Sequence, residues 1–425
     1  MASLRLRQFT LADWSFLILF PGFFFYQSAI GTGMAPAILG GYFSPVCILL
    51  LPFLALVFFA CSAEVKHFIN DADLVFGGFL LYFFFVVTLN FGLGAPTVVV
   101  KHHLVAMLHF VVVFITCRLA RFDDPGFRRV VLVTVVGMSL IIFSMSVDGT
   151  FYLRLQGGAS NEEALATYQG FARSYLLAFL VVAAFMKKMP HRLLLYAVCI
   201  PAFFINGARS EMAVAVAAAA IIEGIHSRHR GLWIAGSAVT GAALFMFFAE
   251  IVSLFPGNRS GQLLDLSGAS SWEARSRLFF FAVDTVLQNP VFGSYGSYLR
   301  LLNNSGSYAH NIVSAWVDLG LIGFLYLFGM LAIPTMRLGL DLLQRGQREK
   351  PAGLIFAFVM LFVTLVMLFT SKSFTYMVIA GAMGVYANYR SKHVQPQGRP
   401  SHLSASALRH TDLRQAMPQP GAPRL

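Results

Sequence analysis

The chain has 425 residues, of which 57% are hydrophobic and only 12% are charged, and its mean hydropathy is +0.71. A soluble protein carries roughly a quarter charged residues, so this composition excludes an ordinary soluble domain and indicates a polytopic membrane protein. The net charge of +12 does not indicate nucleic-acid binding, because the basic residues gather in short connections between apolar runs. We expect membrane lipids, and no nucleic acid, as partners.

Apolar runs near 20 residues long recur along most of the chain, which is the pattern of membrane-spanning helices. We predict an all-α polytopic bundle with about twelve spans. The predicted spans cover residues 12–30, 42–61, 73–92, 103–120, 129–146, 171–187, 191–206, 210–226, 232–255, 309–333, 352–370 and 374–389. The first run follows the basic segment MASLRLRQ, but its length, its internal Pro21 and the spans after it predict a retained helix rather than a cleaved signal.

The connections between the predicted spans indicate their orientation. The basic clusters RLARFDDPGFRR, KKMPHR, SRHR and RLGLDLLQRGQREK fall on alternate connections. Because cytoplasmic loops carry an excess of Lys and Arg, this alternation predicts that both termini are cytoplasmic. Residues 1–389 then form the transmembrane bundle. Residues 390–425, rich in Pro, Gln, Ser and Arg, are predicted to be a disordered cytoplasmic tail.

Two connections on the opposite, outer side are longer than turns, at about 147–170 and about 256–308. The second is the one large periplasmic loop of the predicted architecture. The other connections are short, and the chain shows no internal repeat and no soluble catalytic domain. Any chemistry is therefore expected at the outer face or within the bundle.

Several arginines are predicted to gather on the outer side in one part of the chain. They are Arg209, Arg259, Arg275, Arg277 and Arg300. An arginine near bilayer depth costs roughly 2.5–3.5 kcal/mol, so such residues are usually paired or functional. The guanidinium fork suits a diphosphate, because it donates to two oxygens at once. The simpler interpretation of Arg259 and Arg300 is a solvated charge or a contact to anionic lipid, whereas Arg209 lies in a tight turn between two spans.

The second candidate is the start of the predicted span 309–333. A neutral imidazole at His310 accepts a proton from an attacking hydroxyl or binds the acceptor by a hydrogen bond, and Asn311 caps or orients it. By itself, a histidine at a helix end is more often an interfacial or capping residue. Acidic residues elsewhere have structural interpretations: Glu211 is expected to pair with Arg209, and Glu223 and Glu250 are expected to form interhelical hydrogen bonds.

The same predicted helix carries further polar and small residues. On one continuous helix His310, Ser314 and Asp318 share a face, with Asp318 roughly 12 Å deeper than the histidine. At that depth Asp318 is expected to pair with a polar group of a neighbouring helix. Gly320 and Gly323 are predicted to lie on a flank where a neighbouring helix approaches closely.

Taken together, these motifs resemble the signature of the O-antigen ligase and O-antigen polymerase superfamily. In HNIVSAWVDLGLIG the spacing of His, Asn, acid, Gly and Gly is similar to the family's motif, although the acid there is usually Glu rather than Asp318. Upstream, RLFFFAVDTVLQNPVFGSYGSYL is similar to the family's arginine followed by an aromatic run, and Arg277 matches that arginine best, with Arg275 as the alternative. Arg209 stands where the family places an arginine at the start of a span. The resemblance covers residues of about 206–325, while the N-terminal half agrees only in span number and hydropathy.

The resemblance implies glycan transfer from undecaprenyl diphosphate at the outer face of the bacterial inner membrane, by a multispan glycosyltransferase of the GT-C type. It implies that arginines neutralise the leaving diphosphate and that the histidine positions or deprotonates the acceptor hydroxyl. The implied catalytic residues are His310, Arg277 and Arg209. The implied substrate-binding residues are Arg275, Asn311, Arg259 and Arg300, and the implied structural residues are Asp318, Gly320 and Gly323. The outer segments contain no Asp-x-Asp motif or cluster of His and Asp, so we expect neither a metal ion nor a cofactor.

The sequence leaves three functions open. A ligase transfers the finished glycan to the saccharide of lipid A–core, whereas a polymerase extends one lipid-linked chain with another or makes an exopolysaccharide. A single large outer loop favours the ligase. A flippase or other transporter is also polytopic, but transporters place ionisable groups and broken helices at the bilayer midplane, and here the distinctive polar residues are predicted at the outer ends of spans.

Overall fold

The structure is a computed structural model that describes residues 9–36, 38, 41–65, 68–147, 150–151, 168–227, 270–299, 309, 311–345 and 350–393. Within these ranges the chain is almost entirely helical. The exception is a short antiparallel hairpin of β1 (Ser146–Val147) and β2 (Thr150–Phe151). Eight helices in the described part of the chain are long and apolar enough to cross a membrane. The protein is therefore a helical, membrane-embedded, polytopic protein.

Most helices of the described chain follow the predicted spans closely. They are α1 (Leu11–Leu17), the π-helix η1 (Ile18–Gly22), α2 (Phe23–Gly31), α3 (Phe43–Glu64), α4 (Asp71–Gly92), α5 (Thr97–Leu119), α6 (Pro125–Ser144), α7 (Tyr168–Phe185), α8 (Met189–Asn206), α9 (Arg209–His226), α12 (Ser270–Gln288), α14 (Val313–Gln344), α15 (Ala352–Thr370) and α16 (Val378–His393). The predicted span 232–255 lies outside the described residues, so the number of twelve spans stays a prediction.

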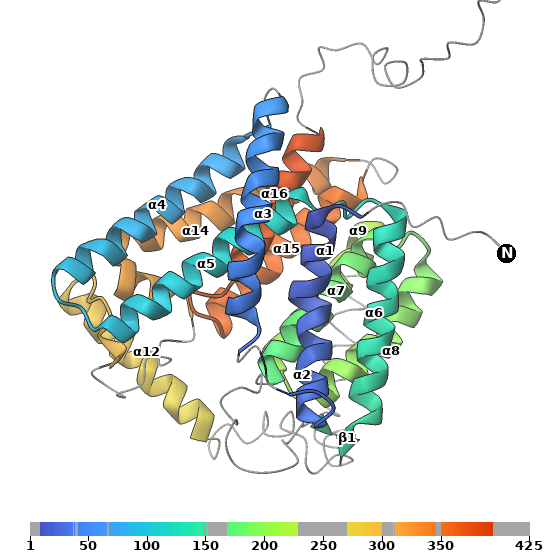
Figure 1. Cartoon of the computed structure of the whole chain (residues 1–425), viewed down its shortest axis with the longest axis horizontal. Coiled ribbons are helices and arrows are strands. Elements are labelled where there is room, and N and C mark those ends of the chain that lie inside the picture. Colours follow the sequence, from blue (N-terminus) through green and yellow to red (C-terminus); the bar gives the residue numbers. More distant parts are fainter. Residues whose placement is uncertain are drawn as a thin grey trace, which may run out of the picture.

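The helices pack as one bundle around a continuous apolar core. In Figure 1, α4 and α14 lie side by side on the left, and α6 and α8 lie on the right. Between these groups α5 packs along α16, and α7 is surrounded by α2, α6, α8, α9 and α15. Most residues of α7 are buried, and its one charged residue, Arg173, is half-buried.

Buried ion pairs join the helices at one end of the bundle, here called the Arg118 end. Arg118 Nε donates to Asp73 Oδ1 over 2.8 Å, with both side chains almost fully buried. The guanidinium of Arg192 donates to both carboxylate oxygens of Glu223, which also accepts a hydrogen bond of 3.0 Å from Tyr196. Glu223 is thus confirmed as an interhelical hydrogen-bonding residue. Removing one partner of such a pair typically costs about 3–5 kcal/mol, so these pairs fix the ends of four helices.

The segment predicted as the large outer loop contains a helix, α12. Leu278, Ala282 and Val286 recur at i, i+4 and i+8 on this helix and form a small core with Tyr298 and Val317. Its other residues are polar enough to lower the hydropathy of the segment, which is why the sequence indicated a connection here and did not reveal the helix within it. In Figure 1, α12 lies along the lower left margin of the bundle, beside α14.

The predicted span 309–333 also differs from the structure. Helix α14 begins only at Val313 and continues to Gln344, and its regular backbone is interrupted at Gly320, where φ is +72° and ψ is −179°. Asn311 and Ile312 precede the helix in a turn. The prediction that residues 310, 314 and 318 share the face of one continuous helix was therefore wrong, because the helix does not extend to residue 310.

Candidate functional site

The opposite end of the bundle, where α7 and α9 begin and α15 ends, is here called the Lys372 end. It carries two neighbouring groups of polar residues. The first, the Arg173 cluster, consists of Arg173, Glu211, Lys372 and Tyr376. The second, the Asp318 pocket, lies between the start of α5, the turn after α12, α14 and the loop 371–377. The same loop carries residues of both groups, so the two groups share one wall.

Lys372 and Glu211 form the ion pair at the centre of the Arg173 cluster. The Nζ atom of Lys372 lies 2.7 Å from Glu211 Oε1, and the side chains are 8% and 0% exposed. Lys372 also donates to Gln169 Oε1 over 3.2 Å, and Ser210 Oγ donates to Glu211 Oε2 over 2.7 Å. The loop between α15 and α16 brings Lys372 onto this carboxylate, and the predicted pairing of Glu211 with Arg209 stays a prediction.

Arg173, one turn into α7, is the second cation of the cluster. Its guanidinium carbon lies 5.0 Å from the ring centre of Phe43 and 5.7 Å from that of Phe23. Its Nε atom is buried and has no hydrogen-bond partner within the part of the chain that the structure describes. Its electrostatic interaction with Glu211 is shared with Lys372, so two cations depend on one carboxylate here. Buried donors are normally hydrogen-bonded, and one that is not marks a place for an acceptor.

Tyr376 completes the cluster from the loop 371–377. Its ring centre lies 5.4 Å from the Nζ atom of Lys372, at the distance of a cation–π contact. Burial of its hydroxyl end raises the pKa of Tyr376 well above its usual value, and the nearby charge of Glu211 raises this pKa further. The phenol therefore keeps its proton and is a hydrogen-bond donor at neutral pH.

Arg209 lies at the same end, in the tight turn that the sequence predicted. Helix α8 ends at Asn206, Gly207 adopts the left-handed conformation with φ +73°, and α9 begins at Arg209. A glycine is favoured at such a helix end because it takes positive φ without a steric cost. The half-buried Arg209 stands two residues before Glu211, so it is a third cation at the Lys372 end.

The start of α14 is tied to the loop that carries Lys372. The backbone N–H of Phe374 donates to Ser314 Oγ over 3.1 Å, and this hydroxyl donates to the carbonyl of Asn311 over 2.7 Å. The side chain of Asn311 accepts a hydrogen bond of 3.1 Å from the N–H of Val313 and so caps the helix. The chain around Asn311 therefore lies beside the loop of Lys372.

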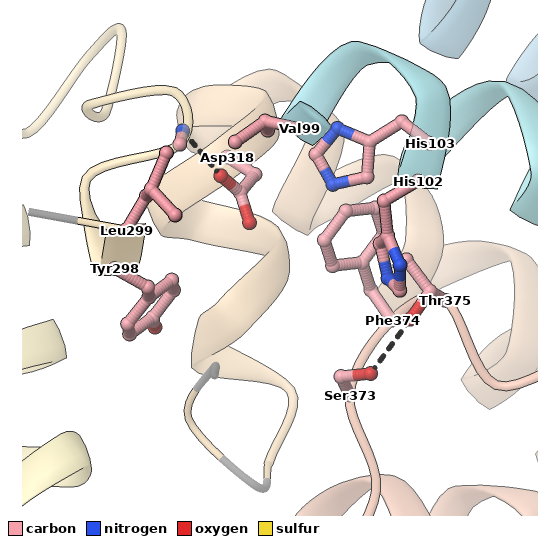
Figure 2. A pocket seen from close by; sticks show the side chains of 10 residues that line it. Val99, His102, His103, Tyr298, Leu299, Asp318, Ser373, Phe374 and Thr375 are labelled. Atoms are coloured by element: carbon pink, nitrogen blue, oxygen red, sulfur yellow. Dashed lines mark hydrogen bonds between the residues drawn. The ribbon is translucent and has the colours of Figure 1, made fainter. Parts of the chain in front are cut away.

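The Asp318 pocket is shown in Figure 2. Asp318 is 5% exposed, and its Oδ1 atom accepts a hydrogen bond of 2.8 Å from the N–H of Gly296. His102 and His103 lie across the pocket from it, and Nδ1 of His103 lies 2.8 Å from the hydroxyl of Tyr295. Burial, with the charge of Asp318 as a smaller cause, raises the pKa of Tyr295 above its usual value. The volume is only about 20 Å³, room for about one water molecule.

Asp318 was predicted to pair with a polar group of a neighbouring helix, and this was wrong. Its partner is a backbone N–H in the turn that follows α12, because α14 breaks at Gly320 and the turn packs into the break. The N–H of Leu321 donates to Val291 O over 3.0 Å, and the N–H of Ser294 donates to Val317 O over 2.7 Å. The turn therefore satisfies backbone groups that an unbroken helix would have paired internally.

The two glycines after Asp318 differ in what lies against them. A Cβ on Gly323 would lie 2.9 Å from Cε1 of Tyr82 on α4, and the hydroxyl of Tyr82 donates to Leu319 O over 2.6 Å. The predicted close approach of a neighbouring helix is confirmed at Gly323. At Gly320 a Cβ would instead lie 2.6 Å from Val291 O, so the close neighbour there is the turn and not a helix.

The two arginines of α12 have accessible side chains. Arg275 is half-buried and Arg277 is exposed. Neither forms an ion pair with any residue that the structure describes. Their convergence with Arg209 on one substrate stays a prediction.

Three predicted site residues, His310, Arg259 and Arg300, lie outside the described residues, as does Glu250. Among the residues with described positions, no group of three His, Cys, Asp or Glu side chains could hold a metal ion. Independence from metals and cofactors stays a prediction.

The sequence analysis did not single out Arg173 or Lys372. Arg173 is an ionisable residue near the start of the predicted span 171–187, and Lys372 stands between two apolar runs in TSKSFTY. An ionisable residue at the edge of a spanning helix is a signal for a buried polar site, and this signal was available for both residues. Their common dependence on Glu211 follows only from the packing of α7, α9 and the loop 371–377.

The comparisons with known proteins give no relative. No protein-family model matches this sequence, and no curated protein matches it. The functional argument therefore depends on the motifs and on the geometry of the Lys372 end.

Proposed function

We propose that this protein is a glycosyltransferase of the bacterial inner membrane. In this proposal it transfers a glycan from undecaprenyl diphosphate to the saccharide of lipid A–core at the periplasmic face. The Lys372 end is then periplasmic, the Arg118 end and both termini are cytoplasmic, and the bundle is of the GT-C type with twelve spans. A polymerase that uses the same lipid-linked donor is the second candidate.

The observation that supports this proposal is the gathering of cationic side chains at the Lys372 end, where Lys372 is buried and Arg173 and Arg209 are half-buried. Arg173, Arg209 and Lys372 come from three different elements, whereas Glu211 is the one carboxylate of the Arg173 cluster. An anion is the natural ligand of such a site, and a diphosphate suits it because guanidinium groups bind phosphate oxygens in pairs. The cluster lies beside the segment around Asn311, which belongs to the motif that resembles the glycan-transferring family.

The proposed reaction is a displacement at the anomeric carbon of the donor sugar. The acceptor hydroxyl oxygen attacks this carbon, the bond from the carbon to the diphosphate oxygen breaks, and the bonding electrons leave with the diphosphate. His310 takes the proton of the acceptor hydroxyl, a contribution typically of about 10²–10⁴-fold. The arginines stabilise the charge that develops on the diphosphate as it leaves. Arg277 and Arg209 are the proposed catalytic cations, and Arg173 extends this set.

The second candidate function, polymerisation, uses the same donor chemistry and differs only in the acceptor. The presence of one long outer segment, 256–308, favours the ligase. A transporter is disfavoured, because the Arg173 cluster lies at the ends of α7 and α9 rather than in the middle of spanning helices.

The proposal is tested with the purified protein in liposomes. Lipid-linked glycan donor is supplied on one side only, with lipid A–core acceptor and a metal chelator, and the glycan-bearing product is measured. We expect a new glycosidic linkage with the wild type and its loss in Arg209→Ala. Extension of one lipid-linked chain by another would identify a polymerase instead. Movement of donor across the bilayer without any new linkage would overturn the proposal in favour of a transporter.

A further inference from the structure

A second cavity, at the Arg118 end, is independent of the proposed function. It lies between the turn 121–124, the start of α6, the end of α7, the start of α15 and the end of α16, and its volume is about 300 Å³. This is within the usual size of ligand pockets, roughly 300–1,000 Å³. We call it the Lys187 pocket. Four separate segments of the chain meet here, so the cavity belongs to the folded bundle.

The polar lining of the Lys187 pocket carries an excess of positive charge. Its cations are Arg128, Lys187 and Lys392, and its one carboxylate is Asp123. Asp123 is already bound to Lys392, whose Nζ atom lies 2.6 Å from its Oδ1 atom. The pKa of Asp123 lies below its usual value: partial burial alone would raise this pKa, and the hydrogen bond and charge of Lys392 outweigh that effect. The charge of Arg128 also lowers this pKa, so Lys392 and Arg128 share Asp123, and three cations of the lining face one carboxylate.

The other two cations of the lining, Arg128 and Lys187, have unused hydrogen-bond donors. Arg128 uses Nε and Nη1 for the carbonyls of Asp124 and Phe185, over 3.4 Å and 3.3 Å, and its guanidinium carries five N–H groups in all. Lys187 is exposed just after the end of α7, and its side-chain ammonium has no hydrogen bond or ion pair with any residue that the structure describes. An anion between these two side chains would satisfy donors that the protein leaves unused.

The start of α15 adds to the positive potential of the pocket. Helix α15 begins after Pro351 without a side-chain cap, and Ala352 and Gly353 line the cavity. The first N–H groups of a helix have no partner within the helix and carry a partial positive charge. This end of a helix of 19 residues therefore favours the same anionic ligand as Arg128 and Lys187.

The rest of the lining is apolar and aromatic. Phe185, Phe356, Val385 and Tyr389 contribute to it, and Arg128 lies 5.4 Å from the ring centre of Phe185. An apolar wall forms no favourable contact with a free inorganic ion, but it matches the glycerol and upper acyl carbons of a lipid. The pocket lies at the ends of spanning helices, which is the depth of the lipid headgroups. Basic pockets between spanning helices are sites for anionic headgroups.

We propose that the Lys187 pocket binds the phosphate-bearing headgroup of an anionic phospholipid from the leaflet at the Arg118 end. The phosphate lies between Arg128, Lys187 and the start of α15, and the apolar part of the lipid contacts Phe185 and Phe356. The ligand class follows from the combination of uncompensated cations with an aromatic wall.

The chain provides matched controls for the two cations. Arg129 and Lys188 follow Arg128 and Lys187 directly, have the same charges, are exposed, and do not line the pocket. The test measures binding of phosphatidylglycerol, phosphatidylcholine and inorganic phosphate to the delipidated protein in detergent, by native mass spectrometry and by lipid titration. The variants are Lys187→Ala, Arg128→Ala and their double, with Lys188→Ala and Arg129→Ala as controls. A thermal unfolding scan of each variant shows whether it folds.

We expect phosphatidylglycerol to bind more tightly than phosphatidylcholine, and inorganic phosphate to bind only weakly. A basic residue near the membrane surface is worth about 1 kcal/mol toward anionic lipid, so each substitution should weaken binding about fivefold and the double variant about 30-fold. The two controls should change binding less than twofold. Equal losses in the controls would overturn the pocket in favour of general surface charge. Equal binding of phosphatidylcholine, or inorganic phosphate binding as tightly as phosphatidylglycerol, would overturn the phospholipid assignment.

Discussion

Both ends of the bundle contain buried cations, but the number of partners that the protein provides for these cations differs between the ends. At the Arg118 end, Arg118 donates to Asp73, to the carbonyl of Phe68 and to the hydroxyl of Ser391. Arg192 at the same end has Glu223 and two backbone carbonyls. Each of these guanidinium groups makes four hydrogen bonds within the protein and has a carboxylate of its own, so their role is to hold helices together.

At the Lys372 end, by contrast, the protein does not saturate its cations. Arg173 and Lys372 share Glu211, and the Nε atom of Arg173 has no acceptor among the described residues. A buried donor without an acceptor lowers stability unless a ligand supplies the acceptor. The comparison therefore separates structural from functional cations by their partners: Arg118 and Arg192 are buried and paired, whereas Arg173 is half-buried and keeps a donor without an acceptor among the described residues.

The largest predicted effect concerns the saturated pairs. Arg118→Ala leaves the buried carboxylate of Asp73 without its partner, and it should lower the free energy of unfolding by about 3–5 kcal/mol. The matched control is Arg390→Ala. It breaks a pair of 3.2 Å with Asp71, an exposed residue two positions before Asp73 in the sequence. Such exposed pairs contribute about 0–1 kcal/mol. Thermal unfolding in detergent measures both variants, and equal losses in the two would contradict the distinction.

The next effect is on transfer rather than on stability. Arg209→Ala, Arg277→Ala and His310→Ala should each lower glycan transfer about 10²-fold or more while membrane abundance stays at the wild-type level. Arg277→Lys should retain little activity, because the point charge of a lysine cannot reproduce the bidentate contact of a guanidinium with the diphosphate. Transfer and abundance are measured together in a deletion strain that carries each variant. Full activity in the three alanine variants would count against the assigned roles.

The deletion strain also separates ligase from polymerase. Loss of all attached O-chain from the lipopolysaccharide is the expected banding pattern for a ligase. Retention of a single repeat on lipid A–core would show that the protein is a polymerase, because the first unit is then still attached by another enzyme.

A smaller effect is expected at the break in α14. Gly320→Ala places a Cβ in a left-handed conformation, 2.6 Å from Val291 O, and should cost about 1–3 kcal/mol. Gly329 lies on the same helix, has ordinary φ, and meets nothing closer than 3.8 Å. Gly329→Ala should be neutral or slightly stabilising, because alanine is the better helix former. A comparison of the two unfolding temperatures tests whether the turn after α12 depends on this glycine.

The sequence predicts some parts of this structure well because they depend on local patterns. Hydropathy places the helices, and the ionisable Glu223 within an apolar run correctly indicates an interhelical hydrogen bond. The turn at Gly207 and the position of Arg209 follow from a small polar segment between two apolar runs. The close approach at Gly323 follows from a small residue on a helix flank.

Other parts depend on packing between distant segments and could not be predicted. Asp318 binds the N–H of Gly296 only because α14 breaks at Gly320, and no local signal distinguishes that glycine from Gly323. Helix α12 is amphipathic, so its mean hydropathy resembles that of a loop. Lys372 pairs with Glu211 through a contact between residues more than 150 positions apart.

The central claim is that the uncompensated cation at the Lys372 end serves a substrate and not the fold. Arg173→Leu tests it most directly, by reconstituted glycan transfer and thermal unfolding of the same preparation, with the exposed Arg129→Leu as control. The account predicts that Arg173→Leu loses transfer about 10²-fold or more while its unfolding temperature is unchanged or raised. Wild-type transfer by a folded Arg173→Leu protein would contradict the account, as would a loss of stability as large as that of Arg118→Ala.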